Sequence, residues 1–244
     1  MLIESTQNPK IKNLRALYRD KRAREEQNVF IAEGINLVKD AKNVKELFIK
    51  ESKAEKLSFL SDRFGVEAYY VKDKIFDALA DTQSPSGVIA IINKEKEKKE
   101  PEGEIVLLLD GIGDCGNLGT ILRTAAARGI QTIVCADCAD AFSPKCVRAA
   151  MSGTFFVNII ETDRKKALEY LKGYSIVGLD MGGQDIFQYR REGRKIALTV
   201  GSEARGLSPE IREKADSIIA IPMSGKMESL NAAISIGIAM YSIQ

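Results

Sequence analysis

The chain has 244 residues, of which 45% are hydrophobic and 29% are charged, with a formal net charge of +2. This length fits one large domain or two small ones with a true hydrophobic core. No apolar run reaches the ~18–20 residues of a membrane span, and the first residues lack the apolar stretch of a signal peptide, so we expect a cytoplasmic protein. The absence of histidine removes the commonest general base and the commonest nitrogen ligand of metals.

The chain begins with a basic helix. Asn8-Pro9 is typical of a helix start, and residues 10–25 are predicted to form one helix. Residues 8–24 carry seven basic side chains and one acidic side chain. Four of the basic residues recur at three- and four-residue spacing, so they would share one face: Lys12, Arg15, Arg19 and Arg22. Such a face is either a solvated surface or a surface that contacts RNA phosphates, and we favour RNA contact.

Short strands and helices alternate through the rest of the first 93 residues, which predicts a small α/β domain. Strands are expected at 29–32, 44–49, 67–71 and 87–92, and helices from Glu33-Gly34 onward, at 53–62 and at 73–80. Residues 94–104 are charged, contain proline and glycine, and include no apolar side chain except that proline. This composition is typical of a linker, so we place a domain boundary there.

Residues 105–244 also alternate between strands and helices. Strands are predicted at 105–109, 132–135, 175–179, 196–200 and 217–221, and helices at 117–128, 144–151, 164–172, 209–214 and 229–243. This order implies a parallel sheet with helices on both faces. The last helix is apolar nearly all round, and Ala233 and Gly237 would let a partner helix approach closely, which favours a dimer interface.

Two patterns suggest other functions. Gly111-x-Gly113-x-x-Gly116, with Asp137 some twenty residues later, resembles a dinucleotide fingerprint and would indicate an NAD-dependent oxidoreductase. Asn117-Leu118-Gly119 separates the third glycine from the apolar helix pattern that starts at Ile121, and a lone glycine fingerprint is a weak signal. Cys135-x-x-Cys138 is half of a zinc motif, but Cys115 and Cys146 do not form a second close pair, so no metal is expected.

Three segments of the second half carry a stronger signal. They are NLGTILRTA (117–125), LTVGSEARGL (198–207), and IPMSG (221–225) followed by ESLNAA (228–233). In order and spacing they resemble the motifs of the SpoU (TrmH) family of SPOUT methyltransferases, across residues 105–244. NPKIK (8–12), FIAEG (30–34) and TQSPSGV (82–88) resemble the substrate-binding domain that precedes many such enzymes.

The resemblance implies a deep trefoil knot near the C-terminus, a homodimer, and S-adenosylmethionine as the cofactor. It also implies methyl transfer to a ribose 2′-hydroxyl of RNA, and the two-domain layout favours ribosomal over transfer RNA. The implied catalytic residues are Asn117, Arg123, Glu203, Ser229 and Asn231, and the implied cofactor contacts are Leu179, Gly201, Ile221 and Leu230.

The role of Arg123 stays open between two alternatives. The family assigns the arginine as a general base, but a guanidinium group almost never gives up its proton. It could instead hold a phosphate and stabilise the developing oxyanion.

Two further alternatives stay open. The protein could be a relative of these enzymes that binds RNA without catalysis. Ser229 and Asn231 could serve only as caps at the start of the last helix.

Overall fold

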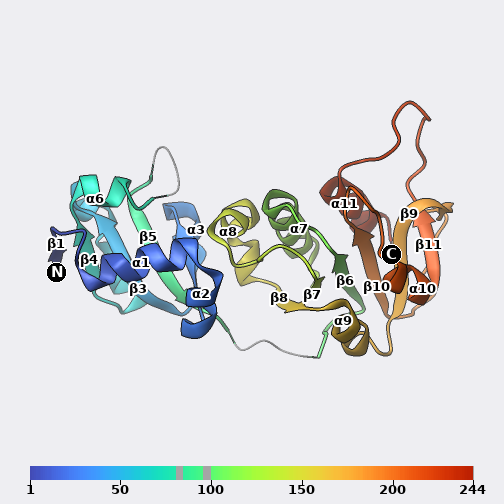
Figure 1. The fold of residues 1–244 in the computed structure, drawn as a ribbon, viewed down its shortest axis with the longest axis horizontal. Helices are drawn as coiled ribbons and strands as arrows, with labels where there is room; N and C mark the ends of the chain where they lie inside the picture. The colour runs from blue at the N-terminus through green and yellow to red at the C-terminus, as the bar shows by residue number, and fades with distance from the viewer. Residues whose placement is uncertain (81–84, 96–99, 244) are drawn as a thin grey trace. The chain divides into compact units, whose positions relative to one another are not determined.

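The computed structural model describes residues 1–80, 85–95 and 100–243 (Figure 1). Part of the TQSPSGV segment, residues 82–84, and part of the predicted linker, residues 96–99, lie outside these ranges. The chain divides into two compact units, one of residues 1–96 and 142–148 and one of residues 97–141 and 149–244. Within the described ranges, none of the helices combines the length and apolarity that crossing a membrane requires.

The first unit contains a mixed five-stranded sheet. In spatial order its strands are β1 (Leu2–Ile3), β4 (Ala68–Val71), β3 (Val44–Lys50), β5 (Val88–Asn93) and β2 (Val29–Glu33). The first three strands run parallel, whereas β5 is antiparallel to both of its neighbours. The short helices are α3 (Ile35–Asp40), α4 (Ala54–Leu57), α5 (Phe59–Phe64) and α6 (Asp73–Asp77), with a 3-10 turn at Glu51–Lys53.

The single helix predicted over residues 10–25 is wrong, because two helices occupy this segment. The first, α1, spans Pro9–Arg19, and its N-cap Asn8 accepts a hydrogen bond from the backbone N–H of Lys10, as the Asn8-Pro9 pair predicted. Asp20 then adopts an extended backbone, and its carboxylate accepts a 2.8 Å hydrogen bond from the Arg22 amide. An aspartate in this position is an N-cap, so it ends α1 and begins α2 (Lys21–Gln27).

This break changes the predicted basic face. Lys12, Arg15 and Arg19 lie on α1, whereas Arg22 lies on α2, so the four side chains do not form one continuous helical face. Leu14 and Leu17 are fully buried in the core of the first unit.

The second unit contains a six-stranded sheet in which every pair of neighbours is parallel, so the predicted parallel sheet is confirmed. In spatial order the strands are β11 (Ser217–Ala220), β9 (Ser175–Asp185), β10 (Ile196–Gly201), β6 (Ile105–Asp110), β7 (Thr132–Ala136) and β8 (Asn158–Thr162). The central strands are buried on both faces, which is why they read as continuous apolar runs. The edge strand β8 was not predicted from the sequence.

Helices cover both faces of this sheet, as expected (Figure 1). On one side α7 (Cys115–Arg128) packs against α11 (Ala232–Ser242). On the other side lie α9 (Arg164–Tyr170) and α10 (Pro209–Lys214), whose apolar side chains enter the core with β6 and β7. A 3-10 helix at Met151–Phe155 also belongs to this unit, whereas most of α8 (Pro144–Ala150) belongs to the first unit.

The expected start of α11 is wrong. The helix begins at Ala232 rather than at residue 229, because Asn231 caps it by accepting hydrogen bonds from the Ala233 and Ile234 amides. Gly237 lies beside α7 of the same chain, since a Cβ on it would lie 3.7 Å from Thr124 Cγ2. The dimer interface expected on α11 stays a prediction.

Candidate active site

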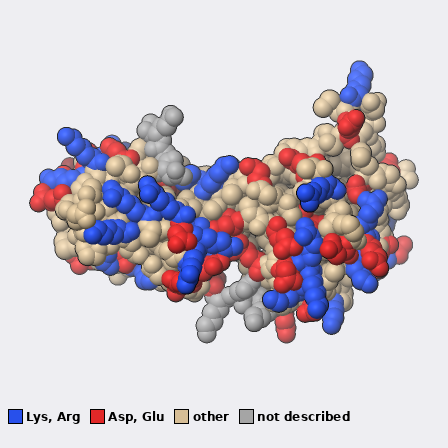
Figure 2. Space-filling view, viewed as in Figure 1, with Lys and Arg blue, Asp and Glu red and all other residues tan. Residues whose placement is uncertain are grey.

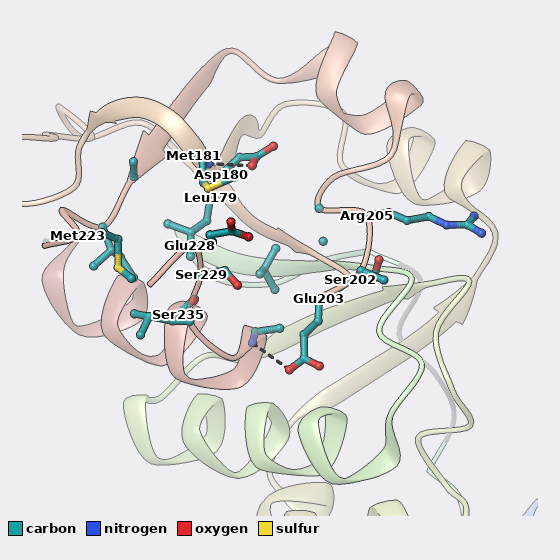
Figure 3. Close-up of a pocket in the computed structure, with 18 residues that line it drawn as sticks. Leu179, Asp180, Met181, Ser202, Glu203, Arg205, Met223, Glu228, Ser229 and Ser235 are labelled. Atoms are coloured by element: carbon teal, nitrogen blue, oxygen red, sulfur yellow. Dashed lines mark hydrogen bonds between the residues drawn. The ribbon is translucent and has the colours of Figure 1, made fainter. Parts of the chain in front are cut away.

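A cavity of about 460 Å³ opens at the carboxyl ends of β10 and β11, beside residues 179–181 in the middle of β9 (Figure 3). In parallel α/β sheets this edge is the usual place for a ligand site, and the volume lies within the range of ~300–1,000 Å³ typical of small-molecule sites. All four residues expected to contact the cofactor lie on its wall: Leu179, Gly201, Ile221 and Leu230. Two strands and the segment after β11, which are distant in sequence, thus contribute to one wall.

The polar part of the wall is mainly acidic. Asp180, Glu203 and Glu228 line the cavity, and the one basic side chain among its lining residues is Arg205. Arg205 extends away from the other labelled side chains (Figure 3). Asp180 forms an ion pair with Arg212 of α10. The sequence did not single out Asp180 or Glu228, although an acid directly after the predicted strand 175–179 was a usable signal for Asp180.

Glu203 lies at the centre of a hydrogen-bond network beside the cavity. Its Oε1 accepts from the side-chain amide of Asn117 at 2.9 Å and from that of Asn231 at 2.6 Å. The backbone amide of Ala232 lies 3.4 Å from the same oxygen (Figure 3). The Asn231 amide also donates to Asn117 Oδ1 at 2.9 Å. Three predicted catalytic residues from α7, the loop after β10 and the start of α11 therefore meet in one cluster.

Each partner of Glu203 is itself held by a helix start. The backbone amide of Asn117 donates to Asp114, the N-cap of α7, at 2.9 Å. Asn231 is the N-cap of α11 and uses its oxygen for the helix and its amide nitrogen for Glu203. Because both asparagines belong to ordered helix termini, their side chains are fixed before any substrate arrives.

The loop that holds Glu203 folds back on the end of β10. A Cβ on Gly201 would lie 1.9 Å from the carbonyl oxygen of Gly206, so a side chain cannot be placed there without moving the loop. The Gly206 amide donates to the Ser202 carbonyl at 2.8 Å, and Gly206 has a φ of 64°. Glycine adopts this left-handed conformation at little cost, which explains Gly206, whereas the close approach of the loop explains Gly201.

The other two predicted catalytic residues are placed differently. Ser229 lies on the cavity wall in the segment before α11, so it does not open the helix. Arg123 is exposed on α7 and is neither among the residues that line this cavity nor within the Glu203 network. The structure of one chain thus brings together Asn117, Glu203, Ser229 and Asn231, but not Arg123.

The structure around Gly111, Gly113 and Gly116 differs from that of a dinucleotide site. The helix α7 begins at Cys115, so Gly116 lies inside it, and the expected separation of this glycine from the helix is wrong. However, none of the three fingerprint glycines lines the cavity. The Asp137 carboxylate, which would hold a ribose in that interpretation, accepts a 2.6 Å hydrogen bond from Arg164 Nη1.

Arg164 also joins a second carboxylate, that of the buried Asp110, through a 2.7 Å hydrogen bond from its Nε. Burial alone would lower the pKa of the Arg164 guanidinium, but its hydrogen bond and charge interaction with Asp110 raise this pKa above the ordinary value. The Asp110–Arg164–Asp137 group is therefore a structural ion-pair cluster with its charges in place.

The cysteine pair shows local packing. Cys135 is buried in β7, and Cys138 lies 3.2 Å from the Leu109 carbonyl and accepts a hydrogen bond from the Ile112 amide. Across the part of the chain that the structure describes, no three His, Cys, Asp or Glu side chains gather in a way that could hold a metal ion.

The basic residues expected to contact RNA remain at the surface of the first unit. Lys12, Arg19 and Arg22 are exposed and Arg15 is half-buried. Figure 2 shows Lys and Arg side chains over α1 and α2, interrupted by acidic side chains. One of these interruptions is an ion pair, in which Arg22 Nε donates to Glu26 at 2.8 Å.

Comparison with known proteins places this geometry in a family. The model of the SpoU rRNA methylase family matches residues 104–241, and that of the MRM3-like substrate binding domain matches residues 8–90. The chain is 32% identical to the 23S rRNA (guanosine(2553)-2'-O)-methyltransferase RlmP of Bacillus subtilis, over 99% of this chain and 98% of the relative.

Solved structures agree with this assignment. An AdoMet-bound rRNA methyltransferase from Sinorhizobium meliloti superposes with a TM-score of 0.87 at 29% identity, covering 99% of this chain and 96% of the other. A TrmH-family putative RNA methyltransferase from Porphyromonas gingivalis superposes with a TM-score of 0.84 at 29% identity, covering 98% of each chain. With its family model spanning more than half of the sequence and a relative matched end to end, the chain belongs to the SpoU rRNA methylase family.

Proposed function

We propose that this protein transfers the methyl group of S-adenosylmethionine to a ribose 2′-hydroxyl of RNA, with ribosomal RNA as the substrate. The observation that carries the proposal is the junction of Asn117, Glu203 and Asn231 beside a cavity lined by strand ends. The name of the Bacillus subtilis relative supports both the reaction and the substrate class. Other relatives are named tRNA/rRNA methyltransferases, so transfer RNA is the second candidate.

The cavity fits the cofactor on its own chemistry. Leu179, Ile221 and Leu230 offer apolar surface for an adenine ring. The excess of carboxylates on the wall suits a molecule with a positively charged sulfonium and an ammonium group, and no phosphate-binding lysine lines it. When bound, S-adenosylmethionine supplies an electrophilic methyl group, and the AdoMet-bound Sinorhizobium meliloti structure supports this choice of cofactor.

The residues around Glu203 position the reacting ribose. Glu203 Oε1 accepts from the amides of Asn117 and Asn231 and lies beside the start of α11. The second oxygen, Oε2, would then orient a hydroxyl or amide of the substrate. In this proposal Arg123 acts through its guanidinium group, by binding a phosphate beside the target ribose and stabilising the oxyanion. Correct placement of the two reactants accounts for much of the rate.

A homodimer explains the position of Arg123. On α11, Ile234 is 53% exposed and Tyr241 is 60% exposed, and with Ile238 they follow the spacing i, i+4, i+7, which lines one helical face. A second copy of the chain would cover this apolar stripe. Because α7 packs beside α11, the exposed Arg123 would then serve the cavity of the partner copy.

The remaining assignments follow from family membership. The C-terminal segment from β11 to α11 would pass through the deep trefoil knot of SPOUT proteins, and residues 105–244 would form the methyltransferase domain. Residues 1–93 would form an RNA-binding domain, joined through a linker at 94–104, with contacts from Lys12, Arg15, Arg19 and Arg22. A protein that modifies ribosomal RNA would act in the cytoplasm.

The test is methyl transfer from labelled S-adenosylmethionine to purified ribosomal and transfer RNA, with mapping of the modified nucleotide by primer extension. Label in ribosomal RNA at a ribose 2′-oxygen is the expected result. Label in transfer RNA alone would mean that transfer RNA, and not ribosomal RNA, is the substrate. Calorimetric titration with S-adenosylhomocysteine and with NAD separates the alternatives, because an RNA-binding protein without catalysis would bind neither.

A further inference from the structure

The loop that presents Glu203, residues 202–207, meets Asp110 at both ends, through the backbone ladder at Gly201 and through the Asp110 side chain at Ser208. Asp110 ends β6 and is 1% exposed. In the parallel pairing of β6 with β10, Asp110 stands opposite Gly201, the residue directly before the loop. Its Oδ2 accepts a 2.6 Å hydrogen bond from the backbone amide of Ser208, the residue at which the loop ends.

The second oxygen of Asp110 is fixed independently. Oδ1 accepts a 2.7 Å hydrogen bond from Arg164 Nε, and Arg164 is the first residue of α9. A buried carboxylate with one oxygen on a guanidinium cannot rotate without breaking a charge-assisted bond. The oxygen that faces Ser208 is therefore held in place, and with it the start of α10, whose N-cap is Ser208.

We propose that Asp110, oriented by Arg164, is a positioning residue that sets the conformation of the loop 202–207 and so places Glu203 against Asn117 and Asn231. This inference rests on the proposed methyl transfer for its catalytic consequence. The loop conformation it predicts can be measured whether or not that function is correct.

The arrangement explains why an acid ends an otherwise apolar strand. Burying an unpaired carboxylate is costly, yet Asp110 satisfies both oxygens within the protein, one toward Arg164 and one toward the loop. Asp137 shares Arg164, but its side chain is 44% exposed and its hydrogen bond goes to Arg164 rather than to the loop, so it provides a matched control.

The first experiment measures hydrogen–deuterium exchange in the Asp110→Asn variant. An amide in place of the carboxylate must point its NH₂ group at either Ser208 or Arg164, both of which are donors. We expect peptides covering 202–208 to exchange at least about tenfold faster, while peptides from β7 stay unchanged. Asp137→Asn should exchange like the wild type. An unchanged rate over 202–208 in Asp110→Asn would overturn the proposal.

A second pair of variants covers the case in which Asp110→Asn does not fold. Ser208 has a φ of −63°, which proline adopts, so Ser208→Pro removes the amide hydrogen that Asp110 accepts. Ser208→Ala keeps this hydrogen and removes only the side-chain cap. The loop should exchange faster in Ser208→Pro than in Ser208→Ala, and equal rates would contradict the proposal.

Kinetics test the link to Glu203. We expect Asp110→Asn to lower kcat for RNA methylation at least about tenfold in the wild-type background but less than about twofold in a Glu203→Ala background, because residues that act as one unit are not additive. Equal losses in both backgrounds would mean that Asp110 does not act through Glu203. A wild-type protein without methyl transfer would refute the proposed function, while the exchange data would still decide the role of Asp110 in the loop.

Discussion

The side-chain amide of Asn117 donates a 2.9 Å hydrogen bond to Glu203, although 86 residues separate them in the chain. The bond joins α7 to the loop after β10, and Asn231 adds the start of α11 to the same carboxylate oxygen. Hydrogen bonds to an ionised acceptor are about twice as strong as neutral ones. The Glu203 carboxylate therefore fixes three segments at the edge of the cavity.

Asn231 has two functions that substitution can separate. Asn231→Ala removes both the helix cap and the donor to Glu203, so we expect a loss of about 1 kcal/mol in the free energy of unfolding together with at least about a tenfold loss of kcat. Asn231→Ser keeps a capping oxygen and should restore most of the stability but not the activity. Chemical denaturation and steady-state kinetics measure the two effects. An active Asn231→Ser enzyme would show that the contact with Glu203 is not needed.

Gly201→Ala should abolish binding of S-adenosylhomocysteine, because the new Cβ would collide with the Gly206 carbonyl and displace the loop that lines the cavity. Gly113→Ala is the matched control, since a Cβ there meets no atom within 4 Å. Isothermal titration of both variants is the measurement. Normal affinity in Gly201→Ala, or a loss in Gly113→Ala, would contradict the site assignment.

Asp137→Ala should leave the affinity for S-adenosylhomocysteine unchanged, because the Asp137 carboxylate binds Arg164 and is not on the cavity wall. If the glycine turn were a dinucleotide site, this acid would hold a ribose. Titrations with S-adenosylhomocysteine and NAD distinguish the two cases. A tenfold weaker affinity of Asp137→Ala for either ligand would support the oxidoreductase alternative.

Arg123→Ala should reduce methyl transfer more than about tenfold, a barrier increase of ~1.4 kcal/mol, while the affinity for S-adenosylhomocysteine stays the same. The reason is that Arg123 does not line the cavity of its own chain. Activity assays with a cofactor titration as control measure this. A variant that retains most of its turnover would remove Arg123 from the catalytic residues.

Mixing two inactive variants tests whether Arg123 acts across a dimer. When Arg123→Ala and Glu203→Ala protomers are co-assembled, each mixed dimer has one site with both residues intact if Arg123 acts on the partner. Random pairing then gives about a quarter of wild-type activity. An inactive mixture would place Arg123 and Glu203 in the same chain's site.

The basic surface of α1 should produce a salt-dependent affinity for RNA. Replacing Lys12, Arg15 and Arg19 with glutamine should flatten the plot of log affinity against log salt by roughly 0.7 for each lost phosphate contact. Replacing Arg22 should add less, because Glu26 already pairs with it. A control variant with glutamine at Lys39, Lys45 and Lys56, exposed on other elements of the same unit, should keep the wild-type slope. Equal slopes in all variants would mean that the α1 residues form a solvated surface that does not contact RNA phosphates.

The sequence by itself determined the features that depend on local order. The run at residues 105–109 predicted β6, and Asn8-Pro9 predicted the start of α1, because strand periodicity and N-caps involve neighbouring residues. The break between α1 and α2 also had a local cause, the Asp20 cap. That signal was present in the sequence but was outweighed by the continuous helical periodicity.

Only the tertiary structure decided which distant residues meet. It brought Asp110 to Ser208 and Glu203 to Asn117 and Asn231, and it placed Gly237 beside Thr124 of α7. The sequence alone gave the type of these residues but not their partners. The order of strands in the sheet sets which loops share an edge, and that order results from the packing of the whole unit rather than from any one segment.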